Sequence, residues 1–144
     1  MEKKQIRVII ADDHTLLRET WKTLLQQDPL FSVIAECANG AQAIEAAQIY
    51  NPDIILMDIN MSPVNGIEAT AEITRTMPGM KIIGISIKNQ PSYARNMLNA
   101  GAKGYITKNS SLEEILEGIK QVAQGETYVC REIKSQMKTE QNEK

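Results

Sequence analysis

The sequence places carboxylate, hydroxyl and ammonium side chains directly after short apolar runs. These are the groups that phosphoryl chemistry needs, because a carboxylate can attack phosphorus and form an aspartyl-phosphate. Mg²⁺ prefers carboxylate oxygens and takes its remaining ligands from phosphate and water. The candidate residues are Asp12, Asp13, Asp58, Ser86 and Lys108.

Three carboxylates that converge on one site repel one another. At ~4 Å and an effective dielectric of about 20, each pair costs on the order of 4 kcal/mol. A divalent cation would remove that repulsion, so we predict a Mg²⁺ site. The ammonium of Lys108 would help to neutralise a transferring phosphoryl group, and the hydroxyl of Ser86 would donate a hydrogen bond to the attached phosphate.

Five apolar, β-branched runs predict five strands, and the segments between them have helical periodicity. Alternation of this kind implies right-handed crossovers and a parallel sheet covered on both faces. Five units are too few for an eightfold barrel, so we predict an open, doubly wound α/β fold whose ligands bind at the carboxyl ends of the strands. The predicted strands are residues 6–10, 32–36, 53–57, 81–86 and 103–106.

Local signals mark the ends of several predicted helices. Asn39 with Gln42 is a capping-box variant, and Ser110 stands three residues before Glu113. Pro91 suits a first helical turn. These signals predict helices that begin near residues 40, 91 and 111.

Residues 126–144 differ from the repeating units that precede them. Val129, Ile133 and Met137 are spaced four apart, which predicts one side of a short helix, and the polar residues from Thr139 onward predict a frayed end. We therefore divide the chain into a domain over residues 1–125 and a tail over residues 126–144. Residues 126–144 would be a C-terminal linker or a tail.

Composition narrows the function classes. The formal net charge is −2, from 16 Lys and Arg against 18 Asp and Glu, so no strong positive field favours nucleic acid. The chain shows no apolar run long enough for a membrane span and no signal-peptide pattern, which predicts a cytoplasmic protein without membrane contact. Cys37 and Cys130 are too few and too far apart for a disulfide framework or a zinc site.

Each candidate residue also has an ordinary structural interpretation. The pair Asp12-Asp13 would cap a helix, Asp58 would be a loop carboxylate, and Lys108 would be solvated. His14, beside the acidic pair, would be an exposed residue at a helix start or a ligand or acid–base group. The functional interpretation is favoured because the polar groups fall together at four predicted strand ends.

The order of these segments resembles response-regulator receiver domains of bacterial two-component systems, and the later segments are similar to the NarL/FixJ (LuxR-type) group. The resemblance covers residues 6–125 and implies a flavodoxin-like (βα)5 fold with strand order 2-1-3-4-5. The segments that carry it are Val8-Ile-Ile-Ala-Asp-Asp-His, Asp58-Ile-Asn-Met-Ser-Pro-Val-Asn-Gly66, Ile85-Ser86 and Ala100-Gly-Ala-Lys-Gly-Tyr-Ile-Thr-Lys108.

The resemblance also implies a role for each matching residue. Asp58 would be the phospho-acceptor, and Asp13, Asp58 and the backbone carbonyl of Asn60 would bind Mg²⁺. Asp12 would position the metal through water. Lys108 would pair with the acceptor and then with the phosphate.

Ser86 and Tyr105 would form a switch pair. After phosphorylation Ser86 would move toward Asp58, and the ring of Tyr105 would turn inward into the space that it leaves. The moving elements would be residues 87–90 and the helix that follows.

Two positions depart from the family pattern. Ser62 separates Met61 from Pro63, where the family usually has Pro directly after Met. Ile87 stands where the family usually has a small residue, so we expect it to act as an access gate to Asp58. Neither departure removes a chemical group.

Three functions compete on this fold. The first is a signalling switch, phosphorylated by a sensor histidine kinase, with a homodimer as one readout and DNA contacted only through a separate output domain. The second is an aspartyl-phosphate phosphatase, which would need a second acid where this chain has Asn60. The third is an interaction domain that needs no phosphate, which the intact acidic set disfavours.

Overall fold

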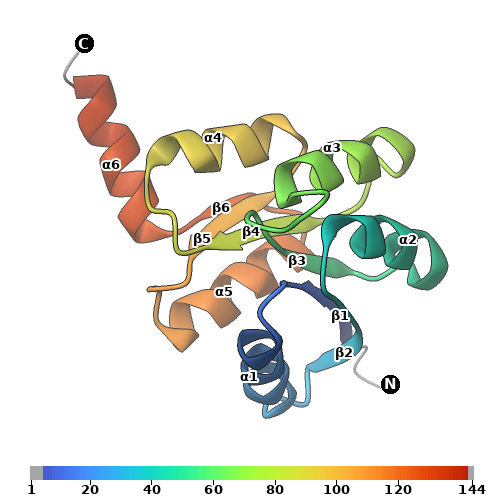
Figure 1. Cartoon of the computed structure of the whole chain (residues 1–144). Helices are drawn as coiled ribbons and strands as arrows, with labels where there is room; N and C mark the ends of the chain where they lie inside the picture. The colour runs from blue at the N-terminus through green and yellow to red at the C-terminus, as the bar shows by residue number, and fades with distance from the viewer. Residues whose placement is uncertain (1–4, 143–144) are drawn as a thin grey trace.

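The computed structural model describes residues 5–142, which form one parallel sheet with helices on both faces (Figure 1). The strands are β1 (Ile6–Ala11), β2 (Phe31–Cys37), β3 (Ile54–Asp58), β4 (Ile82–Ser86), β5 (Gly104–Thr107) and β6 (Tyr128–Val129). The helices are α1 (Thr15–Gln26), α2 (Gly40–Tyr50), α3 (Gly66–Thr76), α4 (Pro91–Asn99), α5 (Leu112–Ala123) and α6 (Arg131–Asn142).

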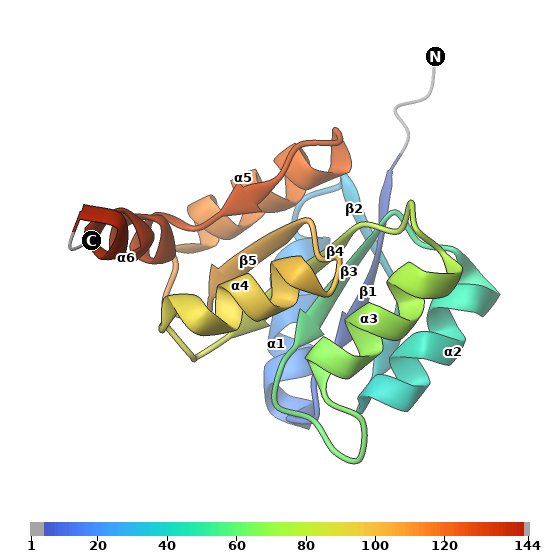
Figure 2. The ribbon, with the colours of Figure 1, turned by 90° about the horizontal axis from the view of Figure 1, so that it is seen from above.

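The strand order is β2-β1-β3-β4-β5-β6, and every pairing is parallel. Helices α2, α3 and α4 cover one face, and α1 and α5 cover the other (Figures 1 and 2). The predicted doubly wound fold and the order of its first five strands are confirmed. The prediction of five strands is wrong, because the short strand β6 extends the sheet beside β5.

The central strands carry the core. Every residue of β3 and β4 is buried, because helices cover both faces of these strands. Their near-continuous apolar sequences follow from that position. A rigid centre of this kind fixes the backbone of Asp58 and Ser86, the last residues of the two strands.

Strand register brings the polar residues to one edge. Ala11 pairs with Met57, Asp58 with Ile85, and Ser86 with Thr107. The carboxyl ends of β1, β3, β4 and β5 are therefore neighbours, as we expected from the sequence.

Helix ends follow the local signals only in part. The side chain of Asn39 accepts the N–H of Gln42 as predicted, and Pro91 opens α4. The cap of α5 is Ser111, whose hydroxyl accepts the N–H of Glu114, so the predicted cap at Ser110 is one residue early.

The C-terminal segment is more ordered than the sequence suggested. Val129 lies in β6, so it does not belong to the predicted helix, while Ile133 and Met137 mark the inner side of α6. The helix continues to Asn142, past Thr139 where the sequence predicted a frayed end, and the last two residues of that prediction, Glu143 and Lys144, lie outside the described residues. None of the helices between residues 5 and 142 is long and apolar enough to cross a membrane.

Candidate functional site

The carboxylates of Asp12 and Asp58 meet beside one ammonium at the carboxyl edge of the sheet. Lys108 Nζ lies 2.9 Å from Asp12 Oδ2 and 3.7 Å from Asp58 Oδ1. Both aspartates are buried, at 1% and 3% exposure. The three residues come from the ends of β1, β3 and β5, so the sheet brings together what the sequence places 96 residues apart.

Asp13 and His14 complete this acidic cluster on the solvent side. His14 Nδ1 lies 2.9 Å from Asp13 Oδ1 and 3.3 Å from Asp12 Oδ1. The His14 side chain is 63% exposed, so the expectation of exposure is met, yet its ring nitrogen faces both acids. The sequence signal for this contact was only the adjacency of His14 to the pair.

The buried carboxyl of Asp58 is held in a site that opposes its charge. The pKa of Asp58 is raised to about 6: burial is the largest cause, the ammonium of Lys108 acts in the opposite direction, and the charges of Asp12 and Asp13 act with burial. The backbone N–H of Asn60 donates to the carboxylate and lowers the pKa slightly. One ammonium therefore leaves the three carboxylates with excess negative charge.

This donor set fits a hard divalent cation. One ligand atom from each of Asp12, Asp13, His14 and Asp58 lies within 4.8 Å of the others. Carboxylate oxygens suit Mg²⁺, and the excess negative charge would be relieved by it. Asn60, the third expected ligand through its carbonyl, lies two residues after Asp58 and is exposed.

The loop after β3 is shaped by a close backbone contact. Gly66, the first residue of α3, donates its N–H to the carbonyl of Ile59, and a Cβ at this position would collide with the backbone carbonyl of Asp58. Glycine therefore lets α3 begin against the acceptor strand. The inserted Ser62 forms a cis peptide bond with Pro63 in the same loop.

Ser86 and Tyr105 meet the same loop residue. Ser86 is fully buried, and its hydroxyl accepts the N–H of Lys88 at 3.1 Å. The hydroxyl of Tyr105 donates to the carbonyl of Lys88 at 2.8 Å. The pKa of Tyr105 is raised to about 12, mainly by burial of its hydroxyl.

The switch hypothesis gave Tyr105 an outward position before phosphorylation, and that position is not the one seen. The ring is fully buried in this structure. Ile87, the expected access gate, is 64% exposed on the loop between β4 and α4.

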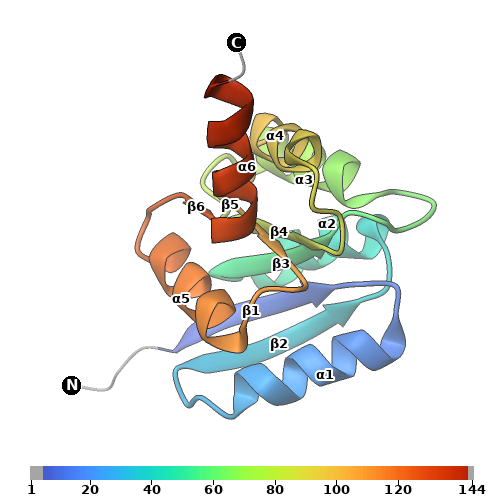
Figure 3. The ribbon, with the colours of Figure 1, turned by 90° about the vertical axis from the view of Figure 1, so that its left-hand side faces the viewer.

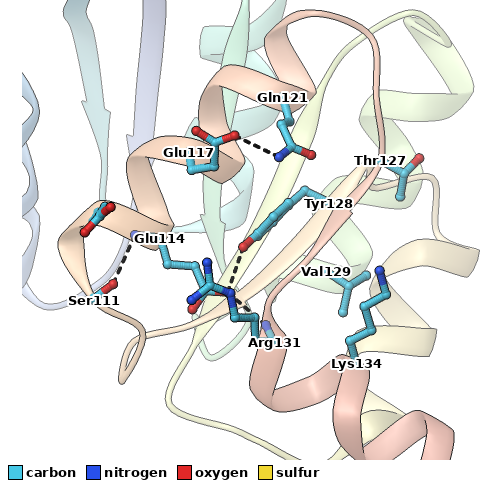
Figure 4. Close-up of a pocket in the computed structure, with 10 residues that line it drawn as sticks. Ser111, Glu114, Glu117, Gln121, Thr127, Tyr128, Val129, Arg131 and Lys134 are labelled. Carbon is cyan, nitrogen blue, oxygen red and sulfur yellow. Dashed lines mark hydrogen bonds between the residues drawn. The ribbon is translucent and has the colours of Figure 1, made fainter.

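A polar groove of about 580 Å³ lies apart from the strand-end site, between α5 and the segment of β6 and α6 (Figure 4). On its floor the carboxylate of Glu114 accepts the hydroxyl of Tyr128 at 2.7 Å and the backbone N–H of Arg131 at 2.8 Å. These bonds fasten the start of α6 to α5.

The sheet order and the acidic strand-end cluster define a receiver domain. The sequence profile of the response regulator receiver domain family matches residues 8–120, and the chain belongs to this family. It is a receiver domain of the two-component response-regulator type, which confirms the resemblance seen in the sequence.

Its relatives include a transcriptional regulatory protein and an oxygen regulatory protein. The chain is 41% identical to the transcriptional regulatory protein DegU of Brevibacillus brevis, over 90% of this chain and 55% of that protein. It is 33% identical to the oxygen regulatory protein NreC of Staphylococcus epidermidis, over 94% of this chain and 62% of that protein. The chain thus spans less than two thirds of the length of these relatives.

Solved structures share this architecture over most of the chain. A LuxR-family two-component response regulator from Aurantimonas sp. SI85-9A1 superposes with a TM-score of 0.93 at 28% identity, covering 96% of this chain and 99% of that one. A LuxR-family DNA-binding response regulator from Staphylococcus aureus gives a TM-score of 0.77 at 30% identity, covering 82% and 98%.

Proposed function

We propose that this domain is a phosphorylation switch in which Asp58 accepts a phosphoryl group from a sensor histidine kinase. The observation that carries the proposal is the buried Asp58 carboxylate beside Lys108 and two further aspartates at the edge of the sheet. Three carboxylates and one ammonium leave excess negative charge, which a bound cation would offset so that an anionic phosphoryl group could approach Asp58.

Asp13, Asp58 and the carbonyl of Asn60 would hold Mg²⁺, with Asp12 positioning it through water. When bound, the ion supplies positive charge to the oxygens of the transferring group. Asp12 also holds the side chain of Lys108 in place, since its carboxylate accepts a hydrogen bond from the Lys108 ammonium at 2.9 Å. The Lys108 Nζ atom is then 3.7 Å from Asp58 Oδ1, so it could contact a phosphate on Asp58 by a change of side-chain conformation alone.

The transfer needs Asp58 in its ionised form. With a pKa of about 6, most of the carboxyl is ionised at neutral pH. One carboxylate oxygen attacks phosphorus, the bond from phosphorus to the donor's imidazole nitrogen breaks, and that nitrogen keeps the electron pair. The product is an acyl phosphate on Asp58, whose oxygens Lys108 and Ser86 would contact.

The signal would pass through Ser86. Its hydroxyl accepts the N–H of Lys88, and a turn toward the phosphate would exchange that bond for one to a phosphate oxygen. A ligand shifts a two-state protein only by binding its states differently, and this exchange supplies such a difference.

The greater length of the relatives supports a wider setting for this domain. Residues 1–125 would act as the phospho-acceptor unit and residues 126–144 as the connection to an output domain. DNA would be contacted only through such a domain, because the net charge of −2 offers little attraction for phosphates. A change in self-association is a second readout of the same switch.

Incubation with Mg²⁺ and acetyl phosphate, followed by intact mass over time, tests the proposal. We expect wild type to gain the mass of one phosphoryl group, Asp58→Asn to gain none, and Glu126→Gln, an exposed control, to behave as wild type. A full adduct on Asp58→Asn would refute the acceptor. Immediate loss of the adduct would favour a phosphatase, and no adduct in wild type would favour a phosphate-independent module.

A further inference from the structure

Helix α6 packs beside the part of the molecule that the switch would move. It contacts α4 and β5 (Figures 1 and 3), and Ile133 on its inner side is fully buried. Strand β6, which leads into α6, pairs with β5, where the N–H of Cys130 donates to the carbonyl of Tyr105 at 3.0 Å. The segment after residue 125 is therefore built onto the strand that carries Tyr105 and ends before Lys108.

The carboxylate of Glu132 joins three elements. It accepts the hydroxyl of Thr107 at 2.8 Å through one oxygen and the side-chain amide of Asn89 at 3.3 Å through the other. Thr107 is fully buried and directly precedes Lys108. Asn89 lies in residues 87–90, the loop between β4 and α4. We call this pair of contacts the Glu132 latch.

The same loop is held from its other side by the switch residues. Lys88 donates its N–H to Ser86 and accepts the hydroxyl of Tyr105 through its carbonyl. Residues 88 and 89 are thus fixed by β4, β5 and α6 together. If Ser86 turned toward Asp58, Lys88 would lose a partner, and the displacement would be felt at Asn89, the next residue.

We propose that the Glu132 latch couples α6 to the phosphorylation site, so that modification of Asp58 loosens α6 from α4 and the loop. The proposal rests on the proposed function for its input and goes beyond it by naming the moving element and its contact. Coupling is reciprocal, so a latch that phosphate opens must itself oppose the phosphorylated state. Breaking the latch should therefore favour that state.

A simpler role for Glu132 would be that of a carboxylate in the first turn of α6, where negative charge stabilises a helix. That role predicts fraying of α6 in Glu132→Ala. It predicts no dependence on Thr107 and no response to modification of Asp58. Glu132→Gln separates the two further, because it loses the charge but keeps an oxygen that can accept the hydroxyl of Thr107.

The test is amide hydrogen exchange of residues 131–139, with Mg²⁺ alone and with Mg²⁺ plus beryllofluoride as a phosphate mimic. The proteins are wild type, Glu132→Ala, Glu132→Gln, Thr107→Val, the double variant Thr107→Val with Glu132→Ala, and the matched control Glu126→Ala. Binding of the mimic is followed separately by ¹⁹F NMR of the bound fluoride.

In wild type we expect the mimic to speed exchange in α6 on the order of tenfold, within the usual range of coupling between sites. Glu132→Ala should exchange faster by a similar factor without the mimic, respond little to it, and bind it more tightly. Thr107→Val should shift in the same direction, and the double variant should be no faster than Glu132→Ala. Glu132→Gln should be intermediate, and Glu126→Ala should match wild type.

If wild type binds the mimic and α6 does not respond, the latch is wrong while the proposed function stands. If wild type does not bind the mimic, the proposed function fails, and the release of α6 fails with it. Additive effects of Thr107→Val and Glu132→Ala, or a Glu132→Gln variant as fast as Glu132→Ala, would assign Glu132 to helix stability alone. If an alanine variant does not fold, amide exchange of wild type and Glu132→Gln, with and without the mimic, still distinguishes the latch from a role in helix stability alone.

Discussion

Two regions of the sheet hold their carboxylates in opposite ways. At the ends of β1 and β3, Asp58 is desolvated beside Asp12 and Asp13, and Lys108 is the ammonium that offsets them. At the edge formed by β6 and α6, Glu132 accepts hydrogen bonds from Thr107 and Asn89. Polar groups at the first region oppose one another, and those at the second satisfy one another.

The difference indicates what each region is for. Charges brought together without compensation destabilise the fold and are retained where a ligand supplies the missing charge. Hydrogen-bonded carboxylates beside an apolar contact, here Ile133, are what attaches one element to another. The strand-end region therefore has negative charge that a bound ligand could compensate, whereas the carboxylate at the β6–α6 edge accepts hydrogen bonds from donors within the chain.

The most severe test of the second region is Ile133→Ala. Ile133 is fully buried in the core cluster, so we expect the free energy of unfolding to fall by about 3 kcal/mol. Urea denaturation measures it, with the exposed Lys138→Ala as a control that should change stability by less than about 0.5 kcal/mol. Equal stability of both variants would mean that α6 does not belong to the folded unit.

In the strand-end region we expect a substitution to raise stability, not lower it. The folded pKa of Asp58, about 6, lies above its ordinary value, so the folded state binds the proton more tightly. That contribution to stability is present at low pH and is lost as pH rises through about 6. Asp58→Asn, which carries no charge, should therefore be more stable than wild type at neutral pH, by about 2 kcal/mol.

Denaturation of wild type and Asp58→Asn at several pH values between about 4 and 7 checks this sign. The gap in stability should narrow toward the acid end. Adding Mg²⁺ at neutral pH should raise the stability of wild type and leave Asp58→Asn nearly unchanged. A variant less stable than wild type at neutral pH would show that the site is not electrostatically strained.

The smallest expected effect concerns the bond between Tyr128 and Glu114. Tyr128→Phe removes a hydroxyl that donates to this carboxylate at 2.7 Å, while the N–H of Arg131 still contacts it. Because the carboxylate keeps one donor, we expect a loss of only about 1 kcal/mol. Thermal unfolding measures it, with Tyr50→Phe on the opposite edge as the control. An unchanged melting temperature in Tyr128→Phe would mean that only apolar packing and the Glu132 latch attach α6 to the rest of the domain.

Much of the strand-end site could be predicted because strand ends and helix caps are local in sequence. Apolar runs located β1, β3, β4 and β5, and parallel pairing then required Asp12, Asp58 and Lys108 to meet. The orientation of His14 toward the acids could not be predicted, since a side chain with 63% exposure is positioned by its neighbours in space.

The C-terminal edge was harder to predict for a physical reason. Strand β6 has two residues, too few for any periodic signal, and it exists because β5 offers it an unpaired edge. The same pairing draws Val129 out of the predicted helical stripe. The cap at Ser111 in place of Ser110 likewise depends on where the chain leaves β5.

The sequence by itself determined the family, the five strand–helix units and the acidic residues after the first and third strands, because apolar periodicity and turn residues are local features of the chain. Only the tertiary structure decided that the tail joins the sheet, that Tyr105 lies inward, and that Glu132 meets Thr107 and Asn89. These contacts join residues up to 43 positions apart. Their formation depends on the packing of whole elements against one another, which no local pattern encodes.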